Sequence, residues 1–380
     1  MTEIKIKDVI VIGSGAAGLA AAHALAKAGL SPVVLEKEDR IGEPWRRRHK
    51  HLRLNTHRDL SSLPGLKFPR GTPAFPSRME VIDHLNAFSQ RQEFPIEFGI
   101  SVEEILRDGN AWTVRTNRGT HRARDVVVAS GRDRDPFFPD WKGVNGFGGR
   151  LIHAADFGEA TDYAGKSVLV IGAGNSGFDA LNHLIRAETG PLWLSARSGP
   201  TILPKRIAKV AVHKVSPLTA ALPLKLADFT VAATQRLVFG DMTKFGLPKP
   251  PSGGVSRLAT DYTAIAADDG AMAAIRKGRI KMVPGVSEFT ADGVVLADGR
   301  TIKPDVVIAA TGYRTGLETM VGKLGVLDRN GTPLFNGPQA VPGWPGLWFT
   351  GMRPSLLGCF RNAVIQGEGI ARAIARSRRG

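Results

Sequence analysis

Cysteine is almost absent from this chain. The only cysteine is Cys359, so no intrachain disulfide can form and no CxxC motif is present. This excludes disulfide-stapled secreted folds and enzymes that use a reactive cysteine pair. Long apolar runs are also missing, since none reaches the roughly 18 residues that a membrane span requires. No signal peptide precedes the first predicted strand, and we therefore predict a cytoplasmic protein without a transmembrane segment.

Acidic residues are in deficit. The sequence has 35 Asp and Glu against 51 Lys and Arg, which gives a formal net charge of +16. Such an excess can steer anionic ligands, bind nucleic acid or an anionic membrane, or keep a protein soluble. The basic residues are spread along the chain, apart from Arg46–Arg48 and the tail at 376–379. No basic stretch is interleaved with aromatic residues, so we expect no nucleic-acid partner and favour a solvated basic surface.

The segment 8–38 predicts a unit that binds a dinucleotide. A β-branched strand leads into a GxGxxG turn made by Gly13, Gly15 and Gly18, then a helix and a second strand that ends at Glu36. In such a turn the first glycine allows the bend, the second lets the backbone approach a pyrophosphate, and the third lets helix and strand pack. The helix N-terminus attracts phosphate, and the acidic residue is suited to hold a ribose hydroxyl.

The same pattern returns at Lys166. A strand over 168–171 is followed by Gly172, Gly174 and Gly177, a helix, and a strand over 192–196. The repeat means two bound nucleotides, or one nucleotide and a degenerate copy. Here Arg197 and Ser198 replace the acid, and a guanidinium beside a hydroxyl suits a 2′-phosphate. This favours NADPH over NADH, although the alternative of an ordinary solvent-facing arginine stays open.

The fold class that follows is α/β, with two Rossmann-like dinucleotide-binding domains, one inserted into the other. We expect the first domain to be discontinuous, over 1–160 and 286–380, because 305–312 (DVVIAATG) mirrors 125–131 (DVVVASG). The second domain is predicted over 161–285, with a helical insert at about 203–260. That insert is either packed against the nucleotide domain, which we favour, or a membrane-surface or substrate-tunnel element. Further expectations are an antiparallel meander over 96–124 and a capping box at Ser77 and Glu80.

Several motifs occur in a fixed order along nearly the whole chain. They are GSGAAG at 13–18, an xxPW turn at Trp45, FGGRLIHAADF at 147–157, GAGNSG at 172–177, ATGY at 310–313 and GLWFTGMRPSLLGCF from 346. The third matches the fingerprint FxGxxxHxxx(aromatic). With these motifs the sequence resembles class B flavin-dependent monooxygenases, of the flavin-containing monooxygenase family and its bacterial and YUCCA-like branch. The last fingerprint position is Phe157, where Baeyer–Villiger enzymes typically carry tryptophan.

The resemblance implies FAD in the first domain and NADPH in the second. It assigns FAD contacts to Gly13, Ser14, Gly15, Ala16, Ala17, Gly18, Glu36, Lys37, Trp45, Asn55, Thr56, Gly131 and Gly351. It assigns NADPH contacts to Gly172, Gly174, Asn175, Ser176, Gly177, Arg197, Ser198, Thr311 and Gly312.

Two further residues receive roles from the resemblance. Asn55 stands where flavin-containing monooxygenases have a residue that contacts flavin and NADP⁺ and supports the peroxyflavin, although a plain turn residue is an equal alternative. His153 is expected to couple cofactor binding to domain position rather than to act as a base. No metal site is predicted, because His49, His51 and His57 lie in a basic loop without acidic partners.

The implied function is an FAD-dependent NADPH monooxygenase. NADPH would reduce FAD, and reduced flavin with O₂ would form a C4a-(hydro)peroxyflavin that oxygenates a small organic substrate. We expect N- or S-oxygenation first and oxidation of a carbonyl or 2-oxo acid next. The alternatives are an NADPH oxidase or flavin reductase without an oxygenation substrate, and a nucleotide-sensing binding protein.

Overall fold

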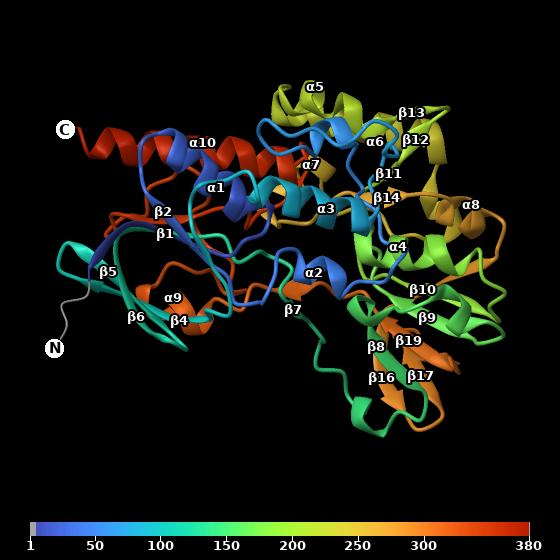
Figure 1. Cartoon of the computed structure of the whole chain (residues 1–380). Coiled ribbons are helices and arrows are strands. Elements are labelled where there is room, and N and C mark those ends of the chain that lie inside the picture. The colour runs from blue at the N-terminus through green and yellow to red at the C-terminus, as the bar shows by residue number, and fades with distance from the viewer. Residues whose placement is uncertain (1–4, 380) are drawn as a thin grey trace. The chain divides into compact units, whose positions relative to one another are not determined.

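The computed structural model describes residues 5–379 and divides the chain into two compact units (Figure 1). The first contains Met1–Arg46, Thr56–Asp135 and Tyr313–Gly380, and the second contains Arg47–Asn55 and Pro136–Gly312. These bounds differ from the predicted boundaries at 160 and 286. The reason is that strands β8 (Arg150–His153) and β19 (Val306–Ala309) join the sheet of the second unit.

The first unit is built on a mixed sheet. In spatial order its strands are β3 (Ile96–Glu97), β2 (Pro32–Leu35), β1 (Ile6–Ile12), β6 (Gly119–Val128), β5 (Ala111–Thr116) and β4 (Val102–Asp108), and β21 (Leu347–Phe349) also pairs with β6. The end of β1 is buried on both faces, as its continuous apolar run predicts for a parallel strand. The predicted antiparallel meander is confirmed by β4, β5 and β6. Strand β6 also includes 125–128, the first part of the segment that 305–312 mirrors.

Helices complete this unit. They are α1 (Ala16–Lys27), α2 (Glu43–Arg46), α3 (Arg78–Ser89), α9 (Glu318–Val321) and α10 (Cys359–Ser377), with 3₁₀ turns at Arg58–Leu60 and Gly322–Leu324. The capping box of Ser77 and Glu80 at the start of α3 is confirmed. Helices α1 and α10 pack along each other (Figure 1), and Gly367 allows it, since a Cβ there would lie 2.9 Å from the Cα of Ala21.

The second unit has a parallel sheet of its own. Its strands run in the order β15 (Ile280–Val283), β10 (Leu192–Ser195), β9 (Val168–Ile171), β19 and β8. All four residues of β9 are buried, because it lies inside the sheet and both faces are covered. After this sheet's last strand in sequence before 286, the chain forms the antiparallel strands β16 (Val286–Thr290), β17 (Gly293–Leu296) and β18 (Thr301–Ile302). Short pairs are formed by β11 (Ile202–Pro204) with β14 (Ala266–Asp268), and by β12 (Arg206–Ile207) with β13 (Val210–Ala211).

The helices of the second unit include the predicted insert. They are α4 (Asn175–Leu184), α5 (Ser216–Ala220), α6 (Leu224–Phe239), α7 (Gly254–Thr260) and α8 (Ala271–Arg276), with 3₁₀ turns at Val144–Gly146, Ala154–Asp156, Ala160–Tyr163, Val212–Val215 and Met242–Phe245. Helix α6 buries Ala227 and Val231 but leaves Phe229 69% and Leu237 85% exposed. The short strands β7 (Asp135–Pro136) and β20 (Tyr313–Arg314) lie where the chain passes between units. Within residues 5–379 no helix is long and apolar enough to cross a membrane.

Candidate functional site

The first glycine turn joins β1 to α1 at the carboxyl end of the sheet. The N–H of Gly13 donates to the carbonyl of Leu35 at 2.8 Å, which fixes the turn beside the end of β2. Gly13 has a φ of +101°, and a Cβ on Gly18 would lie 1.8 Å from the Gly13 oxygen. Gly15 differs, because a Cβ there would meet nothing within 4 Å and no side chain caps the helix that follows. The outer glycines therefore shape the turn, and the middle one leaves open the space that a pyrophosphate needs.

The second glycine turn repeats this geometry between β9 and α4. Gly172 has a φ of +112°, and its N–H donates to the carbonyl of Ser195 at 2.9 Å. A Cβ on Gly177 would lie 1.9 Å from the Gly172 oxygen, whereas one on Gly174 would meet nothing within 4 Å. Helix α4 likewise begins without a side-chain cap. The two turns thus offer the same kind of cradle to a dinucleotide.

The units differ at the residue after the second strand. The register of the hydrogen bonds makes Glu36 in the first unit equivalent to Ala196 in the second. The buried carboxylate of Glu36 accepts hydrogen bonds from the N–H of Ser14 at 2.7 Å and its Oγ at 2.6 Å. Arg197 and Ser198 are exposed, and Arg197 makes no hydrogen bond or ion pair within residues 5–379. The first unit therefore presents an anion, and the second presents an available cation.

The remaining predicted FAD residues belong to the first unit, apart from Asn55. Trp45 is half-buried in α2, Lys37 is exposed, and the hydroxyls of Thr56 and Ser61 are hydrogen-bonded at 2.8 Å. Gly131 follows β6, and Gly351 follows β21. Since β1, β2, β6 and β21 are parallel, their carboxyl ends bring the glycine turn, Glu36, Gly131 and Gly351 to one edge of the sheet.

Gln366 on α10 was missed by the sequence analysis. Its Oε1 accepts hydrogen bonds from the N–H of Gly351 and from the hydroxyl of Thr350, both at 2.9 Å. A signal for it exists, because Gln366 is buried among Ala363 and Ile370 on the apolar face of α10. A polar side chain on such a face requires a partner, and here that partner is the backbone beside the first glycine turn.

Both ring nitrogens of His153 form hydrogen bonds within the second unit. Its Nε2 donates to the carbonyl of Gly312 at 3.0 Å, and its Nδ1 accepts the N–H of Ala155 at 3.1 Å. Burial lowers the pKa of His153, so the ring is neutral at pH 7. The same Gly312 carbonyl accepts the N–H of Phe137, and Thr311 donates its hydroxyl to the Phe137 carbonyl. This geometry positions the end of β19 and leaves neither ring nitrogen free for proton transfer.

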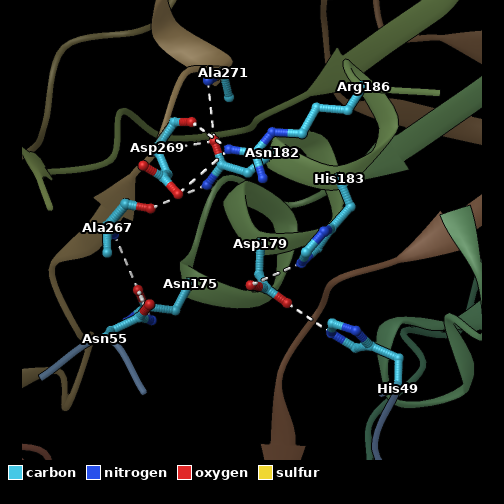
Figure 2. Close-up of polar contacts among 10 residues, drawn as sticks. All are labelled: His49, Asn55, Asn175, Asp179, Asn182, His183, Arg186, Ala267, Asp269 and Ala271. Atoms are coloured by element: carbon cyan, nitrogen blue, oxygen red, sulfur yellow. Dashed lines mark hydrogen bonds and ion pairs between the residues drawn. The ribbon is translucent and has the colours of Figure 1, made fainter. Parts of the chain in front are cut away.

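Asn55 lies in the second unit, in the segment 47–55 (Figure 2). Its Nδ2 donates to Oδ1 of Asn175 at 3.1 Å. Asn175 in turn donates to Ile265 at 3.1 Å and accepts from the N–H of Ala267 at 3.0 Å. The structure therefore joins Asn55 to a predicted NADPH residue in the first turn of α4, while its chain neighbour Thr56 belongs to the other unit.

The expectation that three histidines have no acidic partner was wrong. His49 Nε2 lies 2.9 Å from Asp179, His51 Nε2 lies 3.0 Å from Glu159, and His57 Nδ1 lies 3.4 Å from Asp59. The first two partners are more than a hundred residues away in sequence. Only folding brings them together, so spacing along the chain gave no sign of them.

Comparisons with known proteins agree with the two-turn geometry. A family model described as pyridine nucleotide-disulphide oxidoreductase matches residues 10–197. The probable indole-3-pyruvate monooxygenase YUCCA1 of Arabidopsis thaliana is 31% identical over 96% of this chain and 90% of its own length. The indole-3-pyruvate monooxygenase YUCCA1 of Oryza sativa subsp. japonica is also 31% identical, over 95% and 91%.

Solved structures share the fold. The flavin-containing monooxygenase from Stenotrophomonas maltophilia has a TM-score of 0.73 at 24% identity and covers 98% of both chains. An oxidized steroid monooxygenase bound to NADP has a TM-score of 0.72 at 21% identity, over 98% of this chain and 86% of its own. At these identities the likeness concerns the fold of two dinucleotide-binding domains, and the family follows from the full-length relatives. The chain belongs to the class B flavin-dependent monooxygenases and is an FAD- and NADPH-dependent oxidoreductase.

Proposed function

We propose that the first unit holds FAD, that the second holds NADPH, and that the enzyme oxygenates a small organic substrate with O₂. The observation that carries the assignment of sites is the difference between two otherwise equal turns. Glu36 stands where a ribose hydroxyl is held in the first unit, and exposed Arg197 stands beside the equivalent place in the second. When bound, FAD supplies the transfer of electrons from NADPH to O₂. The chain contributes binding and orientation.

A 2-oxo acid with an aromatic side chain is the substrate class that we place first. The support comes from relatives 31% identical over at least 90% of their length that are named indole-3-pyruvate monooxygenases. The balanced reaction takes one 2-oxo acid, NADPH, O₂ and a proton to the carboxylate shorter by one carbon, CO₂, NADP⁺ and water. This order reverses the sequence-based expectation, which placed N- or S-oxygenation first.

Oxygenation of an amine or thioether is the second candidate. It rests on Asn55, which matches the residue of flavin-containing monooxygenases and hydrogen-bonds to Asn175 at the start of α4. A side-chain amide at that place is suited to hold part of a bound nicotinamide dinucleotide beside the substrate.

The test supplies each substrate class to FAD-loaded enzyme with NADPH and O₂. We expect indole-3-pyruvate to yield about one indole-3-acetate per NADPH consumed, from the stoichiometry above. Thioanisole and N,N-dimethylaniline serve as the thioether and amine, and an oxide from either one with no carboxylate product would favour the second candidate. If every substrate gives only hydrogen peroxide, the enzyme is an NADPH oxidase or flavin reductase. A protein that stays colourless after addition of FAD would refute the flavin site itself.

A further inference from the structure

A cluster of three potential metal ligands lies in the second unit, where helix α4 meets the segment 47–55 (Figure 2). Asp179 and His183 are four residues apart on α4 and so project from one face of the helix. The third member, His49, comes from the segment 47–55. One donor atom from each residue lies within 4.8 Å of the other two.

The distances place a carboxylate between two imidazoles. Nε2 of His49 lies 2.9 Å from Oδ2 of Asp179, and Nε2 of His183 lies 3.8 Å from Oδ1 of the same carboxylate. The two imidazole rings are 5.1 Å apart and nearly perpendicular. Donor atoms of a tetrahedral zinc site with ordinary bond lengths lie about 3.3 Å apart, so small side-chain rotations suffice to close the site.

The burial of the three side chains suits a metal ligand set. The side chain of His49 is only 5% exposed, and those of Asp179 and His183 are 17% and 18% exposed. Phe157 packs against both imidazoles and is itself stacked on Tyr163, which shields one side of the cluster.

One buried polar atom is left over. Nδ1 of His49 has no hydrogen-bond partner among residues 5–379. An unsatisfied buried nitrogen is unusual in a native protein, and a bound water is among its ordinary explanations; an ion bound at Nε2, the nitrogen that faces Asp179, would leave this Nδ1 unchanged. The hydrogen bond to Asp179 alone therefore does not satisfy the whole imidazole.

We propose that His49, Asp179 and His183 form a binding site for a divalent transition-metal ion, with Zn²⁺ as the best match. Two imidazoles and one carboxylate are a common three-residue set for zinc, with a fourth position left for water. The ion would fasten the segment 47–55 to α4, the helix whose first turn contains Asn175 and Ser176. The cations Arg186 and Lys205 lie near the cluster, and their positive charges weaken the binding of a metal ion. We therefore expect a dissociation constant of only about 1–10 μM, well short of a zinc finger.

The experiment titrates Zn²⁺ into the full-length FAD-bound protein, without an affinity tag and after treatment with a chelator. Isothermal titration calorimetry should show one site with a dissociation constant in this range, and Zn²⁺ should raise the melting temperature. Co²⁺ should give the visible absorption of a tetrahedral complex. His183→Gln and Asp179→Asn should each weaken binding at least tenfold. The matched control is His121→Gln, which changes a half-buried histidine on β6 of the first unit and should bind as the wild type does.

Two results would overturn the proposal. One is wild-type protein that takes up no Zn²⁺ in equilibrium dialysis against 100 μM Zn²⁺, on the order of ten times the weakest expected dissociation constant. The other is equal binding by His183→Gln and His121→Gln. Flavin absorbance and circular dichroism establish that each variant is folded, and His183→Gln supplies the test if Asp179→Asn does not fold. Neither result bears on monooxygenation, because Zn²⁺ binding is measured without NADPH or substrate.

Discussion

Replacing Arg197 by alanine should separate NADPH from NADH. The side chain is exposed just past β10, and it makes no hydrogen bond or ion pair within residues 5–379. Its guanidinium is therefore available to the 2′-phosphate, the one group that distinguishes the two dinucleotides. Removing it should take nothing from the fold, because no internal contact of this cation is lost.

The magnitude follows from the strength of one charge-assisted contact. A hydrogen bond to a charged group contributes about 1.5–3 kcal/mol, and an exposed site belongs at the low end of that range. About 1.5–2 kcal/mol corresponds to a roughly 10- to 30-fold rise in KM for NADPH. We expect kcat/KM for NADH to change less than about twofold, since NADH lacks the phosphate. Steady-state oxidation of each dinucleotide at fixed ionic strength measures both values.

The control for the loss of overall charge is Arg300→Ala. Arg300 is also exposed in the second unit, and its guanidinium pairs with Asp298 at 2.7 Å. The variant Arg300→Ala removes one positive charge, as Arg197→Ala does, but at a site that does not adjoin β10. An equal rise in KM for NADH, or the same loss of NADPH affinity in Arg300→Ala, would show that Arg197 does not read the phosphate.

Two further predictions concern the glycine turn and a buried histidine. Gly174→Ala should keep the wild-type melting temperature and raise KM for NADPH at least about tenfold, because its methyl enters the open pyrophosphate space. Gly177→Ala should instead destabilise the protein by about 1–3 kcal/mol, because its Cβ would lie 1.9 Å from a backbone oxygen. Equal behaviour of the two variants in thermal melting would contradict this division. Burial lowers the pKa of His84 to about 4 from 6.5, and its Nε2 accepts the N–H of Leu63. As the pH is lowered, His84 therefore binds a proton in the unfolded chain before it does so in the folded protein. The free energy of unfolding that is present above pH 6.5 should therefore fall as the pH is lowered, by up to about 1 kcal/mol per pH unit between pH 6.5 and 4. Urea denaturation should show a smaller fall in His84→Gln, and an identical pH profile would refute the assignment.

Local patterns predicted the two dinucleotide units well. Strand, glycine turn and helix are neighbours in sequence, so β1 with α1 and β9 with α4 follow from apolar runs and glycine spacing alone. The domain boundaries did not follow. Segment 305–312 resembles 125–131 because each contains a buried parallel strand, but β19 pairs with β9 and not with the first sheet. The residues of a strand indicate whether it is buried, but which strand it pairs with depends on the whole fold.

Long-range polar contacts were the other part that the sequence could not supply. Glu36 was identified because it ends a strand beside its own glycine turn. The pairing of His49 with Asp179 and of Gly351 with Gln366 had no comparable local sign. The first pair spans two separate segments of one unit, and only the burial of Gln366 on an apolar helix face gave any hint of the second.

The late position of β21 and α10 has a consequence for synthesis on the ribosome. Strand β21 pairs with β6 in the first unit, and α10 packs along α1, although both come from the last part of the chain. The second unit is complete once residue 312 has emerged. Synthesis of the first unit begins earlier, but its sheet cannot be completed before residues 347–377 are made, and the second unit can fold during that time. During that interval α1 lacks the helix that covers it, so the surface that α10 later buries stays exposed until the last residues are made.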